Sequence, residues 1–169
     1  MPFVSVLHHL TGLLFFAVLG AAVITDVRSL KIPNEICIAL LLLYPAHILT
    51  GGTVAWLPAL GLAALVFVAG FVPFGFGWMG GGDVKLLAVT ALWAGPTLIG
   101  DFLLLTAVAG GACALVMLAP TRFVLARTLE VVGAGALRDA VLGRSIPYAV
   151  AIAIGAAGSI GPELLHGAG

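Results

Sequence analysis

Long apolar runs with almost no charge are the feature that most limits what this chain can fold into. They lie at residues 4–25, 36–50, 54–74, 84–99, 102–120 and 146–165. A membrane-spanning helix needs about 20 mostly apolar residues. Only 8% of the 169 residues are charged, whereas a soluble domain has roughly 25%. The sequence therefore predicts an all-α, polytopic membrane helix bundle with about six transmembrane helices, in a single domain at residues 1–169.

The connectors between these runs are short and marked by glycine or proline. The second and fourth runs are short for a full crossing, so we expect their helices to continue into Asn34 and into residues 80–82. Gly51-Gly52, residues 75–82 and Gly95-Pro96 mark such connectors. The segment at residues 121–145 is longer and carries four arginines. Its spacing fits a helix lying on the membrane surface, and a solvated loop remains an open alternative.

Lysine and arginine residues predict the orientation, because such residues near span ends stay on the cytoplasmic side. With the N-terminus outside, the first, third and fifth connectors lie inside. Together they hold all seven basic residues: Arg28, Lys31, Lys85, Arg122, Arg127, Arg138 and Arg144. Both termini are then external. The first run lacks a preceding positive charge and a cleavage site, so we expect it to be a retained span and not a signal peptide.

Composition also excludes several functions. The net charge is zero, so the chain has no basic field that would favour nucleic acid. Cys37 and Cys113 stand alone in apolar runs, without the neighbours that a zinc site needs. No metal site is therefore expected. The four histidines lie toward the outer side or mid-span and are expected to be structural; they are His8, His9, His47 and His166.

Two acidic residues stand at membrane boundaries in this topology. Asp26 follows the first apolar run and Asp83 precedes the fourth, so both are expected on the cytoplasmic side. A carboxylate there is costly to hold without a partner or a purpose. Two carboxyl groups held close cannot both ionise easily, so one can act as a general base toward water while the other polarises a carbonyl. The pair predicts the chemistry of an aspartic protease.

Simpler explanations exist for each aspartate taken alone. Asp83 follows three glycines and precedes an apolar run, which is typical of a helix N-cap. Asp26 could form an ion pair with Arg28 or Lys31. Two acids on one side of a nearly charge-free protein favour a function. The glycines at 80–82 permit close approach and unusual backbone shapes, which a site for an extended peptide would need.

The segments around both aspartates resemble the two signatures of the type IV prepilin peptidases. The first is Asp26 followed by Ile-Pro-Asn at residues 32–34. The second is Gly-Gly-Gly-Asp-Val-Lys-Leu-Leu at residues 80–87, which contains the GxGD pattern. Ser-Ile-Pro-Tyr-Ala at residues 145–149 resembles a weaker third pattern at the start of the last span.

This resemblance implies a six-span membrane aspartic endopeptidase with Asp26 and Asp83 as the catalytic pair. Such an enzyme removes the positively charged leader of prepilins or pseudopilins at the cytoplasmic face of the bacterial inner membrane, just before the substrate's hydrophobic helix. No metal or organic cofactor is implied, and the expected partners are the substrate helix and the lipid bilayer. Four further motif positions are expected to shape the site or bind substrate: Gly80, Gly82, Lys85 and Pro33.

Longer relatives carry an additional N-terminal cytoplasmic segment, often with four zinc-binding cysteines, which is associated with methylation. The sequence shows no such segment, so it resembles the short form associated with Flp-type, tight-adherence pili, and methyltransferase activity is not expected.

Two other functions remain open at this level. Membrane carboxylates also serve as proton relays, so a small proton-coupled transporter is one alternative. A relay normally places ionisable groups at several depths, whereas only His47 lies well inside an apolar run. The second alternative is a non-catalytic assembly factor for a pilus or secretion apparatus, which would tolerate Asp26→Asn and Asp83→Asn.

Overall fold

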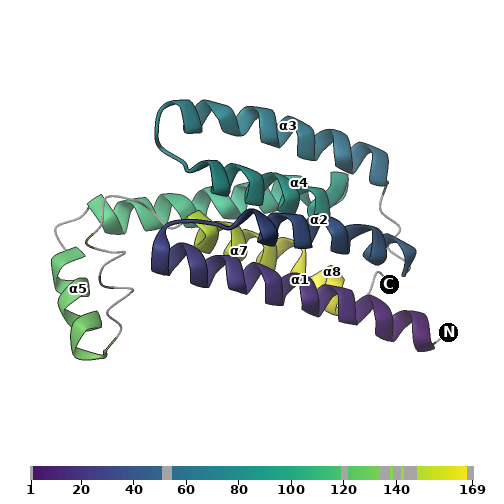
Figure 1. Cartoon of the computed structure of the whole chain (residues 1–169), viewed down its shortest axis with the longest axis horizontal. Coiled ribbons are helices and arrows are strands. Elements are labelled where there is room, and N and C mark those ends of the chain that lie inside the picture. The colour runs from purple at the N-terminus through teal and green to yellow at the C-terminus, as the bar shows by residue number, and fades with distance from the viewer. Residues whose placement is uncertain are drawn as a thin grey trace.

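The computed structural model describes residues 2–50, 55–118, 122–133, 138, 142 and 148–166. Within these ranges every regular element is a helix, and none is a strand. Most helices run along one common direction, and one short helix crosses them at one end (Figure 1). The predicted all-α bundle is confirmed.

The first two helices are antiparallel and joined by a short connector. α1 (Pro2–Ser29) continues four residues beyond the predicted end of the first run, so Asp26 lies in its last turn. The helix stops because Leu30 adopts a left-handed φ of 52° and donates its N–H to the Asp26 carbonyl oxygen at 2.7 Å, which is an αL helix termination. Pro33, with a φ of −59°, then precedes α2 (Asn34–Leu49). The expected extension of this helix to Asn34 is confirmed.

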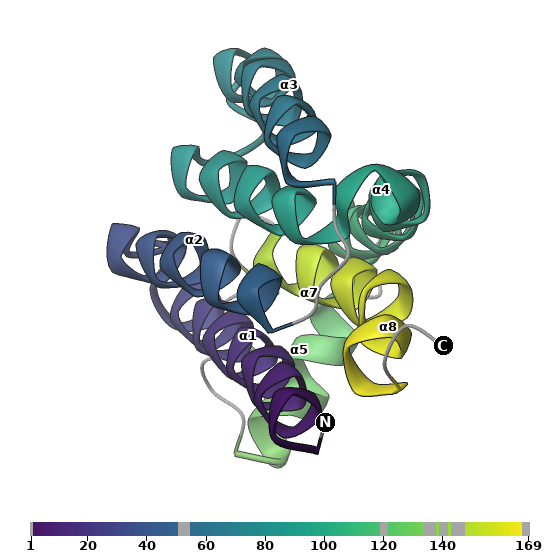
Figure 2. The same cartoon turned by 90° about the vertical axis from the view of Figure 1, so that its right-hand side faces the viewer.

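The next helices are α3 (Trp56–Gly75) and α4 (Gly81–Leu118), and α4 is folded back on itself. Gly95 has a φ of 59° and a ψ of −174°, which interrupts the helix. Glycine reaches this positive φ without strain, and the following Pro96 has no N–H to continue the helical pattern. The two halves of α4 consequently lie side by side (Figures 1 and 2). The prediction that the fourth run reaches residue 99 was wrong: the turn comes at Gly95.

The C-terminal half matches one of the open alternatives and differs from the prediction in one place. α5 (Arg122–Val131) is helical and crosses the bundle end in Figure 1, so a solvated loop is wrong for these residues. The last run was predicted as one span at 146–165. It is instead α7 (Tyr148–Ser159) followed by the short α8 (Gly161–His166). The remainder of the 121–145 segment lies mostly outside the described residues.

Small residues allow α7 to pack closely against the second half of α4. A Cβ atom built on Gly155 would lie 2.9 Å from the Phe102 carbonyl oxygen and would overlap the Thr106 side chain. Ala151 and Ala156 are fully buried beside it. Close backbone approach through small residues is the usual way in which membrane helices associate. α7 is thereby held firmly in the centre of the bundle.

The outer surface is apolar, as a lipid-facing surface must be. Leu42, Leu49 and Leu104 are large side chains that are mostly exposed, along with many others on the helices. Three helical stretches of the described chain are long and apolar enough to cross a membrane: Val6–Ser29, Trp56–Gly75 and Gly81–Leu115. Asn34–Leu49 and Tyr148–Ser159 are shorter apolar helices. Together they make the protein a membrane helix bundle.

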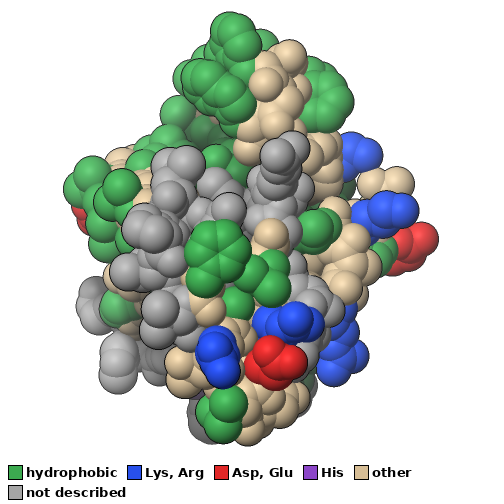
Figure 3. All heavy atoms as spheres, turned by 90° about the vertical axis from the view of Figure 1, so that its left-hand side faces the viewer, with side chains coloured by type: hydrophobic (Ala, Val, Ile, Leu, Met, Phe, Trp, Pro, Cys, Tyr) green, Lys and Arg blue, Asp and Glu red, His purple; other side chains and the backbone are tan. Residues whose placement is uncertain are grey.

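The connectors from α1 to α2 and from α3 to α4 lie at the same end of the bundle, and α5 lies at that end as well (Figure 1). Lysine and arginine side chains gather on this end (Figure 3). We call it the aspartate end, because it holds both Asp26 and Asp83.

Candidate active site

Both predicted aspartates line one cavity at the aspartate end. The cavity has a volume of about 550 Å³ and is bounded by the α1–α2 connector and by the glycine-rich start of α4. The Asp26 side chain comes from α1 and the Asp83 side chain from α4, and their residues are only 4% and 9% exposed. Asp26 is near enough to Asp83 to act on it electrostatically. The expectation that the two acids meet across the bundle agrees with this placement.

Asp26 is held by the beginning of α7. Its Oδ2 atom accepts a hydrogen bond from the Ala149 backbone N–H at 3.0 Å. The first N–H groups of a helix have no partner within the helix and carry partial positive charge, so a carboxylate is favoured there. Within the described residues no ion pair joins Asp26 to Arg28 or Lys31. The ion-pair explanation for Asp26 is therefore wrong.

Asp83 is the third residue of α4, and it folds back toward the residue before the helix. Its Oδ2 atom accepts a hydrogen bond from the Gly80 backbone N–H at 3.0 Å. This is the reciprocal half of a capping box, in which the N3 side chain satisfies the N–H of the capping residue. Asp83 thus stabilises the helix start from N3, and the simple N-cap assignment is wrong.

The second oxygen of Asp83 is the unusual atom of the site. Asp83 Oδ1 is buried and has no hydrogen-bond partner among the described residues. Buried polar atoms almost always have a partner, so each exception calls for an explanation. Four other buried side-chain atoms in the described residues share this lack, on His8, Tyr44, Thr90 and Thr106. Asp83 is the only one of these five residues that lines the cavity, so the unpartnered oxygen belongs to a residue of the candidate site.

Gly80 and Gly82 are needed for space. A Cβ atom on Gly80 would lie 2.9 Å from Asp83 Oδ2, and one on Gly82 would lie 3.0 Å from the Cβ of Ile32. Neither glycine has a positive φ, so the predicted need for an unusual backbone shape is not borne out here. Gly82 instead lets the start of α4 approach Ile32 in the α1–α2 connector, and Gly80 leaves room for the Asp83 carboxyl group.

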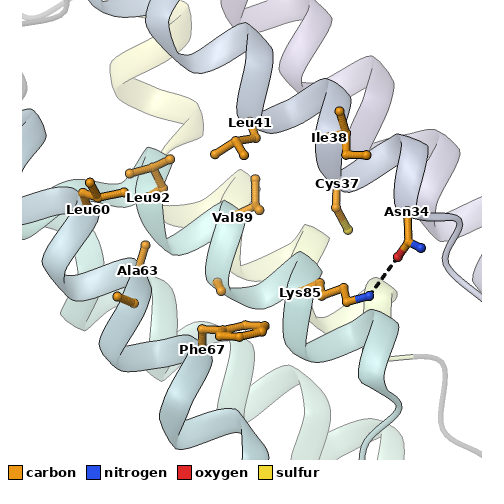
Figure 4. A pocket seen from close by; sticks show the side chains of 12 residues that line it. Asn34, Cys37, Ile38, Leu41, Leu60, Ala63, Phe67, Lys85, Val89 and Leu92 are labelled. Atoms are coloured by element: carbon orange, nitrogen blue, oxygen red, sulfur yellow. Dashed lines mark hydrogen bonds between the residues drawn. The ribbon is translucent and has the colours of Figure 1, made fainter.

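The other two predicted site residues lie in different places. Pro33 lines the cavity together with the residues around it. Lys85 does not line it: its Nζ atom donates a hydrogen bond to Asn34 Oδ1 at 2.9 Å, on the wall of a neighbouring groove (Figure 4). Lys85 therefore links α4 to the start of α2 and stands apart from the two carboxyl groups.

Sequence reasoning missed the role of the Ala149 backbone. Ala149 belongs to the weak third pattern, which signalled a relation to the site but not its form. A hydrogen bond between residues 26 and 149 depends on how α7 docks in the bundle. Ser145, Ile146 and Pro147 of the same pattern lie outside the described residues.

His8 and His47 do not line this cavity, and their rings contact each other. The rings of His8 and His47 are 4.6 Å apart between centroids, and the ring of His47 lies 5.0 Å from that of Trp93. Thr11 Oγ1 is 3.2 Å from His47 Nδ1. No group of three potential metal ligands occurs in the described parts of the chain.

Comparison with known proteins identifies the family. The family model described as the type IV leader peptidase family matches residues 13–115, which is more than half of the chain and includes both aspartates. The chain belongs to the type IV leader peptidase family. Membership assigns it to a class of membrane-embedded peptidases, in agreement with the apolar bundle and the paired carboxyl groups. No curated protein and no solved structure matches the chain significantly.

Proposed function

We propose that this leader peptidase family member is an aspartic endopeptidase that removes the leader of type IV prepilins or pseudopilins, with Asp26 and Asp83 as the catalytic pair. One observation carries the proposal. Two buried carboxyl groups from different helices line a single cavity, and one of their oxygens has no partner within the described residues. A buried carboxyl oxygen without a hydrogen-bond partner is costly to maintain unless it is used.

The chemistry is the addition of water to a peptide bond. The ionised carboxyl group takes a proton from water while the water oxygen attacks the carbonyl carbon. The protonated carboxyl group donates its proton to the carbonyl oxygen, which gives a tetrahedral diol. The C–N bond then breaks as a proton passes to the leaving nitrogen. The products are a carboxylate on the leader and a new amino terminus on the mature protein.

The charges of the cavity suit a positively charged leader. Its acidic residues are Asp26, Glu35 and Asp83, and its one basic residue is Lys31. An excess of acidic groups attracts cationic peptides and steers their approach. Flp-type prepilins are the first substrates to test, on the resemblance to the short family members, and other prepilins and pseudopilins belong in the same panel.

The same end of the bundle carries the basic residues expected at a cytoplasmic face. Arg28 and Lys31 lie at the end of α1 and in the α1–α2 connector, Lys85 lies in the first turns of α4, and Arg127 lies on α5. Positively charged residues near span ends are retained in the cytoplasm. We therefore propose that the active site opens at the cytoplasmic side of a bacterial inner membrane, with both termini outside.

Co-expression with a candidate prepilin tests the proposal. Wild type should shift the prepilin to the smaller mature form on a gel, and Asp26→Asn or Asp83→Asn should leave it uncut. Asp101→Asn is the matched control, because Asp101 is exposed and belongs to the second half of α4, beyond the turn. Cleavage that persists in both site variants would remove the aspartic mechanism and favour another role for the carboxyl groups.

A further inference from the structure

A second hollow lies beside the candidate active site, in the side of the bundle. It is a groove of about 500 Å³ formed by α2, α3 and the first half of α4 (Figure 4). Each of the three helices contributes residues at positions i, i+3, i+4 and i+7, starting from Asn34, Leu60 and Lys85. This spacing means that one continuous face of each helix lines the groove. Seven residues of helix extend about 10 Å, so the groove is roughly two helical turns long.

The groove is open toward the lipid. α2 and α3 both lie against α4, which forms the floor between them (Figures 2 and 4). The residues Ile38, Leu41 and Leu60 on its walls are 52%, 46% and 51% exposed. Apart from Asn34, Lys85 and the thiol of Cys37, the lining side chains are hydrocarbon. An occupant must therefore be mainly apolar and must be able to arrive from within the membrane.

The groove continues into the candidate active site. Asn34 lines both the groove and the cavity that contains the aspartates. The hydrogen bond from Lys85 Nζ to Asn34 Oδ1 spans this junction, and Lys85 follows Asp83 by two residues on the same helix. The polar side chains of Asn34 and Lys85 thus lie at the end of the groove that is next to the aspartates. The rest of the groove runs away along the helices.

We propose that this groove holds the apolar helix of the substrate, with the helix beginning at the Asn34–Lys85 pair. An apolar helix in the groove would fill the space between α2 and α3. The polar segment that precedes it would then pass over the pair into the cavity, where the bond to be cut meets Asp26 and Asp83. This inference rests on the proposed function and adds the site that selects the substrate's membrane segment.

Filling the groove tests the inference. Ala64 and Ala69 are both exposed alanines on α3, but only Ala64 lines the groove. Ala64→Trp should reduce kcat/KM for a full-length prepilin by roughly tenfold to a hundredfold, since small misplacements of a bound substrate have effects of this size. Ala69→Trp should leave it within about twofold of wild type. Equal activity of the two variants, both folded, would overturn the groove assignment.

A crosslinking experiment tests whether the substrate helix contacts the groove without requiring cleavage. The background variant carries Cys37→Ala and Cys113→Ala, which remove the native thiols, and Asp83→Asn, which prevents cleavage. A single cysteine is then introduced by Leu41→Cys in the groove wall. In the control it is introduced by Leu42→Cys, at a neighbouring position that is 71% exposed and outside the groove. Prepilin variants carry one cysteine each along their apolar helix. Disulfide formation with the substrate should occur at position 41 and fall to background at position 42.

The outcomes separate the groove from the proposed function. Cleavage by wild type without any position-41 crosslink would overturn the groove and leave the peptidase function intact. Absence of both cleavage and crosslink across the prepilin panel would overturn both. A disulfide between two copies of this chain at position 41, formed equally with and without substrate, would identify a second copy as the occupant and overturn the substrate assignment.

Discussion

The two ends of this bundle both contain buried polar side chains, but they use them differently. At the aspartate end, Asp26 and Asp83 face a cavity of about 550 Å³. The opposite end, where α1 begins and α2 ends (Figure 1), holds the histidine cluster of His8 and His47. There His47 packs against the rings of His8 and Trp93 and lies within hydrogen-bond distance of Thr11. The first arrangement leaves room for water and a peptide, whereas in the second the rings contact one another.

The comparison shows that a polar residue inside a membrane protein does not by itself mark a functional site. Both ends satisfy that criterion. The aspartate end combines it with a cavity, with backbone donors that fix each carboxyl group, and with an adjoining apolar groove. Chemistry is therefore expected at the aspartate end alone.

The largest loss of activity is expected on substitution of either catalytic carboxyl group. Asp26→Asn and Asp83→Asn should each lower the rate of leader removal by roughly 10²- to 10⁴-fold. The double variant should be no slower than the slower single variant, because groups that act as one unit have non-additive effects. The measurement is the rate of leader removal for the three variants. Independent, multiplicative losses would show that the two acids do not share one reaction.

A smaller effect is expected from the contact that positions Asp83. Gly82→Ala would bring a Cβ atom within 3.0 Å of the Ile32 Cβ and 3.3 Å of its carbonyl oxygen. The start of α4 must then shift, and we expect kcat to fall by about tenfold. Gly100→Ala is the control, since its Cβ position has no atom within 4 Å apart from its chain neighbours and the backbone of its own helix. If both variants cleave at the wild-type rate, the close approach at Gly82 is not needed for catalysis.

The Asn34–Lys85 hydrogen bond should have a weaker influence. Lys85→Met and Asn34→Ala each remove this bond of 2.9 Å between exposed partners, so we expect a loss of about three- to fivefold in kcat/KM. The double variant should match either single one if the bond is what matters. Additive losses would mean that the two side chains act separately. This double-mutant cycle tests the hydrogen bond at the junction between the aspartate end and the groove.

The histidine cluster should show no effect on chemistry. His47→Ala removes a buried ring that contacts His8 and Trp93, and we expect it to lower the free energy of unfolding by about 1–3 kcal/mol. The rate of leader removal per folded molecule should stay within about twofold of wild type. Thermal unfolding in detergent and a cleavage assay measure the two quantities. A large loss of rate with unchanged stability would give His47 a part in function and revive a proton-relay role.

Local sequence signals predicted much of this molecule. The apolar runs predicted the helical bundle, and Gly95-Pro96 marked the turn inside α4. The basic residues and the two aspartates were predicted on one side, and the structure places both acids at the same cavity. Each of these follows from residue type and from spacing along the chain.

The remaining features depend on tertiary packing and had no local signal. The hydrogen bond from Ala149 to Asp26 joins residues 123 positions apart. Its formation requires α7 to be seated against α4 through Gly155 and its small neighbours. Lys85 bonds to Asn34 and does not line the cavity. This contact depends on the rotation of α2 relative to α4. The sequence marked these residues by motif position but could not show which atoms meet.

The most direct test of the account uses purified protein and one prepilin. Leader removal by wild type and by Asp83→Asn is followed over time in lipid vesicles, with the cut bond determined from the product masses, and with equal thermal unfolding showing that both proteins are folded. The account predicts a single cut at the leader junction by wild type and no product from Asp83→Asn on the same timescale. Cleavage by a folded Asp83→Asn protein at a rate near that of wild type would contradict it.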